Sequence, residues 1–108
     1  MPIALRKLGA KKKTATGTGG AATLNAAYGV VTTESLTTAA GATFTETITN
    51  DDVAATDICL ASVTTAGTGA PAIIKTTPAA GSLVITVQNV HAAAAFNAVI
   101  KIAFACFK

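Results

Sequence analysis

The residues that most often perform chemistry in proteins are few and scattered in this sequence. The single histidine, His91, stands near Asn89 in a predicted loop. The three serines, Ser35, Ser62 and Ser82, show no motif that would present a nucleophile. A serine hydrolase site needs a nucleophile, a base and an orienting acid that converge in space. We therefore expect no enzymatic activity, and we expect His91 either to hydrogen-bond the backbone at a strand end or to lie in a subunit contact.

Metal and cofactor sites have little support in the sequence. Two cysteines and one histidine lack the spacing of a zinc site. The acidic segment 50–57 lacks the glycine and the closing glutamate of a calcium-binding EF-hand loop, which favours a solvated turn. The glycine-rich segment 17–20 has no Gly-Lys-Ser/Thr ending and is no phosphate-binding loop. We expect no cofactor, no metal and no small-molecule substrate.

Positive charge is concentrated at the N-terminus, although the whole chain is only 12% charged and has a formal net charge of +3. Residues 1–13 contain five basic residues and no acidic one, whereas the remaining chain is slightly acidic. We therefore predict that residues 1–27 form an extended basic arm, which a flexible Gly/Thr-rich segment connects to the body. We expect this arm to contact an acidic protein surface rather than nucleic acid, because it has neither base-stacking aromatics nor a recognition helix. The expected contact residues are Ile3, Leu5, Arg6, Lys7, Leu8, Lys11, Lys12 and Lys13.

The oxidation state of the two cysteines depends on the compartment in which the chain folds. Only residues 3–5 form an apolar stretch before the first charges, too few for a secretory signal. No uninterrupted apolar run is long enough to cross a bilayer, so we expect no membrane partner. Synthesis in a cytoplasm would keep cysteines reduced. We expect Cys59 and Cys106 to be buried free thiols, although in a sandwich they could face each other across the core.

Residues 28–108 have the pattern of short strands separated by turn residues. The segment 43–49 alternates strictly, which places its four threonines on one face. Similar patterns predict further strands at residues 30–36, 58–63, 72–75, 83–90 and 99–107, with one helical turn at residues 91–95. Six short strands at this spacing predict an all-β fold, an antiparallel β-sandwich or jelly-roll-like domain. The domain boundary then lies between the arm, 1–27, and the body, 28–108.

Two local features complicate this pattern. Glu46 shares a strand face with Phe44 and Ile48, so either that face is partly exposed or Glu46 pairs with Lys75 or Lys101. Residues 39–50 and 79–89 both run from Ala-Ala-Gly into a strand that ends in asparagine. This echo could mark two similar halves packed face to face, but we favour the reuse of one turn type in a sequence of low complexity.

The core of such a domain must be thin, because the chain has four phenylalanines, one tyrosine and no tryptophan. Small cores of this kind usually need additional support, for which self-association is one source. The last predicted strand is apolar on both faces. We therefore predict an oligomer whose seam contains Val99, Ala103, Ala105 and Phe107.

Two segments of the body carry a resemblance to a known class of proteins. They are residues 31–41 with the threonine-rich strand that ends at Asn50, and residues 78–85 continuing through Asn89 and His91 to Phe96. Together they resemble small virion proteins of tailed bacteriophages, of the capsid decoration (cement) or head-fibre type, over about residues 30–108. At position 46 similar proteins tend to carry an apolar residue. The basic arm lies outside the resemblance.

The resemblance implies a function without catalysis. We expect a capsid decoration protein that clamps neighbouring subunits of the major capsid protein, sits on the capsid surface of the virion and is made in the host cytoplasm. Because decoration proteins often occupy sites where three capsid subunits meet, it also implies a homotrimer rather than a dimer. The alternatives are a tail or fibre component, a nucleic-acid-associated protein inside the particle and, disfavoured by the missing signal, a bacterial adhesin or pilus module.

Overall fold

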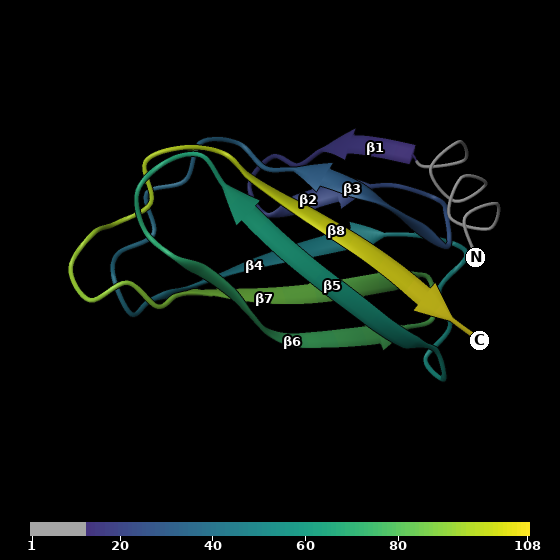
Figure 1. The fold of residues 1–108 in the computed structure, drawn as a ribbon. Helices are drawn as coiled ribbons and strands as arrows, with labels where there is room; N and C mark the ends of the chain where they lie inside the picture. The colour runs from purple at the N-terminus through teal and green to yellow at the C-terminus, as the bar shows by residue number, and fades with distance from the viewer. Residues whose placement is uncertain (1–12) are drawn as a thin grey trace, which may run out of the picture.

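The computed structural model describes residues 13–108, and this part of the chain is a two-layered β-sandwich without a helix (Figure 1). Sheet A contains, in spatial order, β1 (Lys13–Thr16), β3 (Tyr28–Thr32), β8 (Ile100–Phe107) and β5 (Ile58–Thr65). Sheet B contains β2 (Ala21–Thr23), β4 (Thr43–Thr49), β7 (Ser82–Asn89) and β6 (Pro71–Ala79). The predicted all-β sandwich is confirmed. No helix in the described residues could span a membrane.

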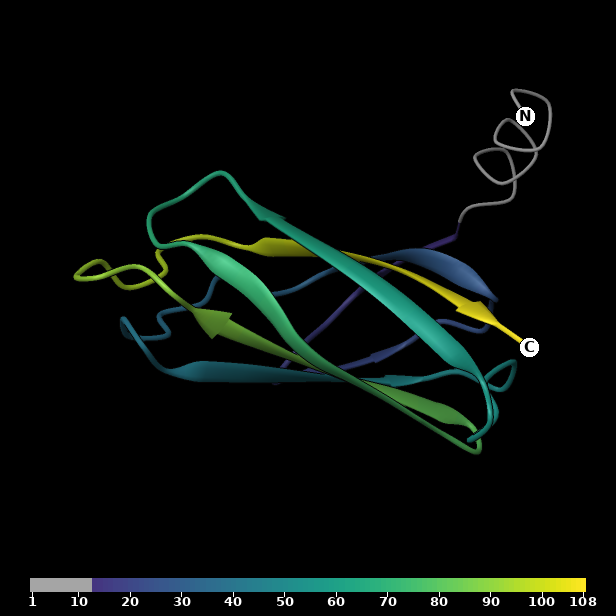
Figure 2. The same cartoon turned by 60° about the horizontal axis from the view of Figure 1, so that its bottom comes forward.

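The chain passes repeatedly from one sheet to the other, so that strands adjacent in sequence mostly lie in opposite layers (Figure 2). The long strands pair antiparallel, as predicted. The two short strands differ, because β1 pairs parallel with β3 and β2 pairs parallel with β4. Each forms the edge of its sheet. The N-terminal strands are therefore the shortest and most peripheral part of the described fold.

The core lies between the two sheets and follows from the alternation in the sequence. Leu83, Ile85 and Val87 of β7 are fully buried, and so are Ile100 and Ile102 of β8, as their period of two predicts. On β4 the four threonines are exposed, which confirms the predicted polar face. Outside the strands, the side chain of Phe96 closes one end of this core.

Two buried asparagines close the ends of the central strands of sheet B. Asn50 and Asn89 follow or end β4 and β7, and neither is exposed to solvent. The amide of Asn50 donates to the carbonyl of Gly81, and the amide of Gly41 donates to the carbonyl of Asn89. Both glycines have φ of 81°, a left-handed conformation that favours glycine. The echo in the sequence therefore has a structural counterpart, with its two copies side by side in one sheet rather than face to face.

Three local predictions need correction. The arm predicted for residues 1–27 is too long, because Lys13–Thr16 and Ala21–Thr23 are strands of the sandwich. Residues 91–95 form an irregular loop instead of a helical turn, because side chains rather than successive backbone groups accept its amide hydrogen bonds. The predicted strand at 72–75 extends over Pro71–Ala79 and contains two prolines, which an edge strand such as β6 tolerates.

Candidate interaction surface

The single histidine, His91, has a structural role in the described chain. Nδ1 of His91 accepts hydrogen bonds from the amides of Ala93 and Ala94 at 3.0 and 2.8 Å. The ring therefore stabilises its own loop, which confirms the expectation that His91 hydrogen-bonds the backbone at a strand end. Among residues 13–108, no group of three or more histidine, cysteine, aspartate or glutamate side chains gathers to hold a metal ion.

Asp57 is the best-connected carboxylate of the acidic segment. Its Oδ2 lies 2.9 Å from Nζ of Lys108 and accepts a hydrogen bond from the amide of Ala54 at 3.0 Å. These two interactions, the first being the stronger, lower the pKa of Asp57 below its ordinary value. The same Lys108 ammonium also donates to the carbonyl of Asp52. The segment is thus a turn fastened to the C-terminal residue.

The outer face of sheet A is the most apolar exposed surface of the described strands. Ile58 and Leu60 of β5 are 69% and 59% exposed, and Phe107 of β8 is 55% exposed. The antiparallel register places Ile58 opposite Phe107 and Leu60 opposite Ala105, so these side chains stand next to one another. We name Ile58, Leu60, Ala103, Ala105 and Phe107 the apolar face of sheet A. None of these five residues is charged, and Lys101 lies exposed on the same side of β8, two positions before Ala103.

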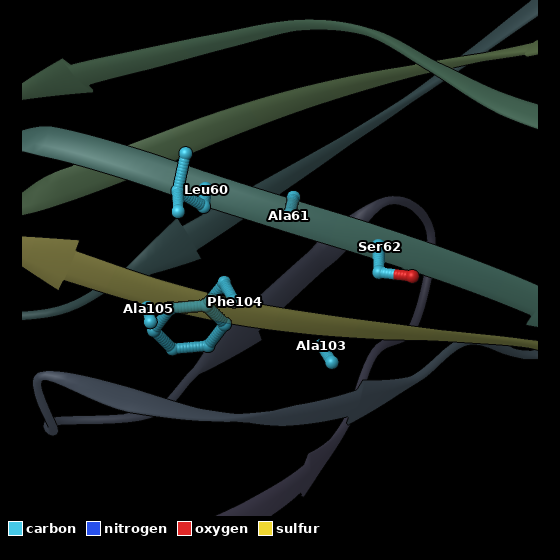
Figure 3. A pocket seen from close by; sticks show the side chains of 6 residues that line it. All are labelled: Leu60, Ala61, Ser62, Ala103, Phe104 and Ala105. Carbon is cyan, nitrogen blue, oxygen red and sulfur yellow. The ribbon is translucent and has the colours of Figure 1, made fainter.

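Between β5 and β8 this face is slightly hollowed. The hollow measures about 280 Å³ and opens widely to solvent. Figure 3 shows that its lining comes from only these two strands; the residues are Leu60, Ala61, Ser62, Ala103, Phe104 and Ala105. Alanine and serine leave the backbone uncovered here, and the larger Leu60 stands beside them. A shallow, apolar, open hollow of this kind fits a side chain of another protein better than it encloses a small molecule.

A disulfide joins the two strands that form this face. Cys59 of β5 and Cys106 of β8 lie opposite each other in the register, with their Cα atoms 4.1 Å apart and their sulfurs bonded. The expectation of two free thiols is therefore wrong, and so is their placement across the core. The amide of Cys106 donates to Ala27 on the other side of β8, which makes Cys59 and Cys106 a non-hydrogen-bonded pair, the closest kind in an antiparallel sheet.

The predicted oligomer seam lies on the apolar face of sheet A and just beyond it. Ala103, Ala105 and Phe107 point outward from β8, and Val99, 40% exposed, precedes the strand. Sequence reasoning missed Ile58 and Leu60, which add two large exposed side chains to this surface. Their alternation with Cys59 and Ala61 could have revealed an outward apolar pair, but only knowledge of the β5–β8 pairing places them beside Phe107.

Most of the predicted contact arm falls outside the described residues. Ile3, Leu5, Arg6, Lys7, Leu8, Lys11 and Lys12 belong to residues 1–12, which the structure does not describe. Lys13 is described and begins β1; its ammonium donates to the carbonyl of Asn25 at 3.1 Å. The arm's contact with a partner therefore stays a prediction.

Of the two expectations for Glu46, the ion pair is wrong, because no described lysine lies close enough to form a salt bridge with it. Its strand face is partly exposed at Phe44, but Glu46 itself is 0% accessible. Both carboxyl oxygens lack a hydrogen-bond donor among the described residues. Burial, followed by the charge of Glu34, raises the pKa of Glu46 to about 7. The carboxyl thus occupies an apolar core position without compensation.

The chain was also compared with known proteins. No family model, no curated protein and no solved structure matches it.

Proposed function

We propose that this chain is a non-enzymatic structural protein of a bacteriophage virion, a decoration protein that binds the major capsid protein. The observation that carries the proposal is the cluster of large apolar side chains exposed on the apolar face of sheet A. Isolated exposed apolar side chains are common, but adjacent large ones on one sheet face mark a surface that another protein covers. The resemblance of residues 30–108 to small virion proteins supplies the identity of the particle.

In this proposal the apolar face of sheet A packs against identical faces in a homotrimer. β8 is a central strand, so self-association through it must be face to face rather than by adding strands at an edge. Ile58, Leu60 and Phe107 are 69%, 59% and 55% exposed, so covering this remaining surface stabilises the contact by about 1–2 kcal/mol for each side chain. Val99, Ala103 and Ala105 let the backbones approach closely.

The basic residues of the N-terminal segment then contact the major capsid protein. Five basic residues precede residue 14, and the body carries a slight excess of acidic residues, so attraction to an acidic capsid surface acts through this segment. The disulfide agrees with this location, because virions spend part of their existence outside cells, where disulfides persist.

Sedimentation equilibrium tests the self-association. The full chain is expected to sediment as a trimer, and the double variant Leu60→Asp with Phe107→Asp as a monomer, because the two carboxylates added to each face would be buried without solvation. Ile74→Asp is the matched control, since Ile74 is 53% exposed on sheet B and its replacement should leave the trimer intact.

Binding to particles tests the partner. Particles that lack this protein should bind the purified full chain in a salt-dependent manner. Replacing Lys11, Lys12 and Lys13 with alanine should weaken binding and reduce that salt dependence. A wild-type monomer would contradict the trimer, and a triple variant that binds like the parent at two salt concentrations would contradict the electrostatic role of the arm.

A further inference from the structure

The turn between β1 and β2 covers the buried carboxyl of Glu46. A Cβ atom built on Gly17 would lie 2.6 Å from Oε2 and 3.0 Å from Oε1 of Glu46, so the backbone of Gly17 rests directly on the carboxyl group. Gly17 itself is buried. A side chain at position 17 would therefore require the carboxyl of Glu46 to move. We name residues 17–20 the covering turn.

The covering turn is held by hydrogen bonds and contributes no large apolar side chain. The amide of Gly17 donates to the carbonyl of Thr32 at 2.8 Å, and the amide of Gly19 donates to Oε1 of Glu34 at 3.0 Å. On the other side, the amide of Thr47 donates to the carbonyl of Gly20 at 2.7 Å. The flanking strands are four and three residues long and lie at sheet edges. Segments of this kind have low local stability.

Ionisation of Glu46 is energetically unfavourable while the covering turn is closed. A protonated carboxyl can remain in the core at modest cost, whereas an ionised one without donors is strongly disfavoured there. The neighbouring elements place no positive charge next to Glu46. β7 has Ile85 opposite Glu46, β2 contains only alanine and threonine, and the covering turn contains only glycine and threonine. Among residues 13–108, the titratable group that acts on Glu46 is Glu34, whose negative charge opposes ionisation. Because the backbone of Gly17 lies on the carboxyl, opening of the covering turn would admit water to it.

We propose that Glu46 and the covering turn form a proton-controlled latch, closed over the protonated carboxyl and opened when the carboxyl ionises. Opening detaches β1 from β3 and β2 from β4, because the turn joins the two edge strands. The free edges of β3 and β4 then become available for pairing with another strand. The latch acts near neutral pH, since the pKa of Glu46 in the closed state is about 7.

Amide hydrogen exchange of the full chain, read residue by residue by NMR, tests the latch. Rates at pH 5.5 and pH 8.0 are converted to protection factors, which removes the pH dependence of the chemical exchange step. The protection of the Gly17 and Thr18 amides should fall by more than about tenfold between these pH values, as expected from a carboxyl with a pKa near 7 when closed and near 4.5 when open. The protection of the Ile102 amide in β8 should fall less than that of the turn, because opening of the latch relieves the ionised carboxyl without unfolding the core.

Two variants assign the effect. Glu46→Gln keeps the shape of the side chain and removes its ionisation, so the protection of the covering turn should become independent of pH. Glu34→Gln should retain the fall but shift its midpoint to lower pH, because a repelling charge is removed. Constant protection of the turn in the wild type would overturn the latch. It would also be overturned by an equal fall in Glu46→Gln, by loss of the fall in Glu34→Gln, or by an equal fall at Ile102.

Discussion

The side chain of Asn89 provides the sharpest test of how the sandwich is held together. It is inaccessible to solvent and makes four hydrogen bonds to backbone groups of four different residues. Oδ1 accepts from the amides of Ala70 and His91, both at 3.1 Å. Nδ2 donates to the carbonyls of Thr38 and Ala94, at 3.1 and 2.9 Å. One amide group thus ties three loops together at one end of the fold.

The expected cost of Asn89→Ala follows from these partners. The substitution leaves the amides of Ala70 and His91 and the carbonyl of Ala94 without this partner, whereas the carbonyl of Thr38 still accepts from the amide of Phe96. Each buried group left unpaired costs about 1–3 kcal/mol. Because part of the loop can relax toward water, we expect a loss of about 3–5 kcal/mol in the free energy of unfolding. A domain of this size has only about 5–15 kcal/mol in total, so the variant should be close to unfolding.

Urea denaturation followed by circular dichroism measures this loss. The matched control is Gln88→Ala, whose Nε2 makes one exposed hydrogen bond to the carbonyl of Gly41 at 3.1 Å, and which should lose about 1 kcal/mol or less. If Asn89→Ala loses no more than Gln88→Ala, the interpretation of Asn89 as the tie between the loops is refuted.

Three further outcomes are expected. Cys59 and Cys106 should resist alkylation until a reductant is added, as mass spectrometry can show, and reduction should lower the free energy of unfolding by about 3–4 kcal/mol for a separation of 47 residues. Because the pKa of Glu46 is raised, its contribution to stability is complete below pH 4.5, decreases as the pH rises and levels off above about 7; the decrease amounts to about 3 kcal/mol and should vanish in Glu46→Gln, as denaturation at several pH values can measure. Because the pKa of Asp57 is lowered by Lys108, its contribution is present above pH 3.8 and is lost at lower pH; Lys108→Ala should reduce this acid sensitivity in the same assay.

The sequence predicts the alternating strands well and the short edge strands poorly. Residues 43–49 and 100–107 alternate so regularly that burial on one face follows directly, and β4 has the predicted bounds. Residues 13–23 contain threonine, alanine and glycine without large apolar side chains, and their composition is that of a flexible segment. They become strands because β3 and β4 offer unpaired edges, a tertiary effect that local sequence does not contain.

The candidate surface could be predicted only in part for the same reason. The outward residues of β8 follow from its period of two, but Ile58 and Leu60 join them through a pairing between strands that lie more than thirty residues apart. The disulfide depends on that same register, because only the β5–β8 pairing places Cys59 next to Cys106. The expected folding compartment predicts free thiols and contains no information about this pairing. The apolar neighbours of Glu46 in the sequence indicate that a charged side chain interrupts an apolar strand face. Its burial depends on the backbone of Gly17, which no local pattern indicates.

A density map of the intact virion, at a resolution that shows β-strands, tests the central proposal most directly. The proposal predicts three copies of this sandwich around a site where capsid subunits meet, with Ile58, Leu60 and Phe107 of each copy facing the other two and the N-terminal segment on the major capsid protein. A particle that carries the protein only in its tail, or that leaves the apolar face of sheet A in solvent, would contradict it.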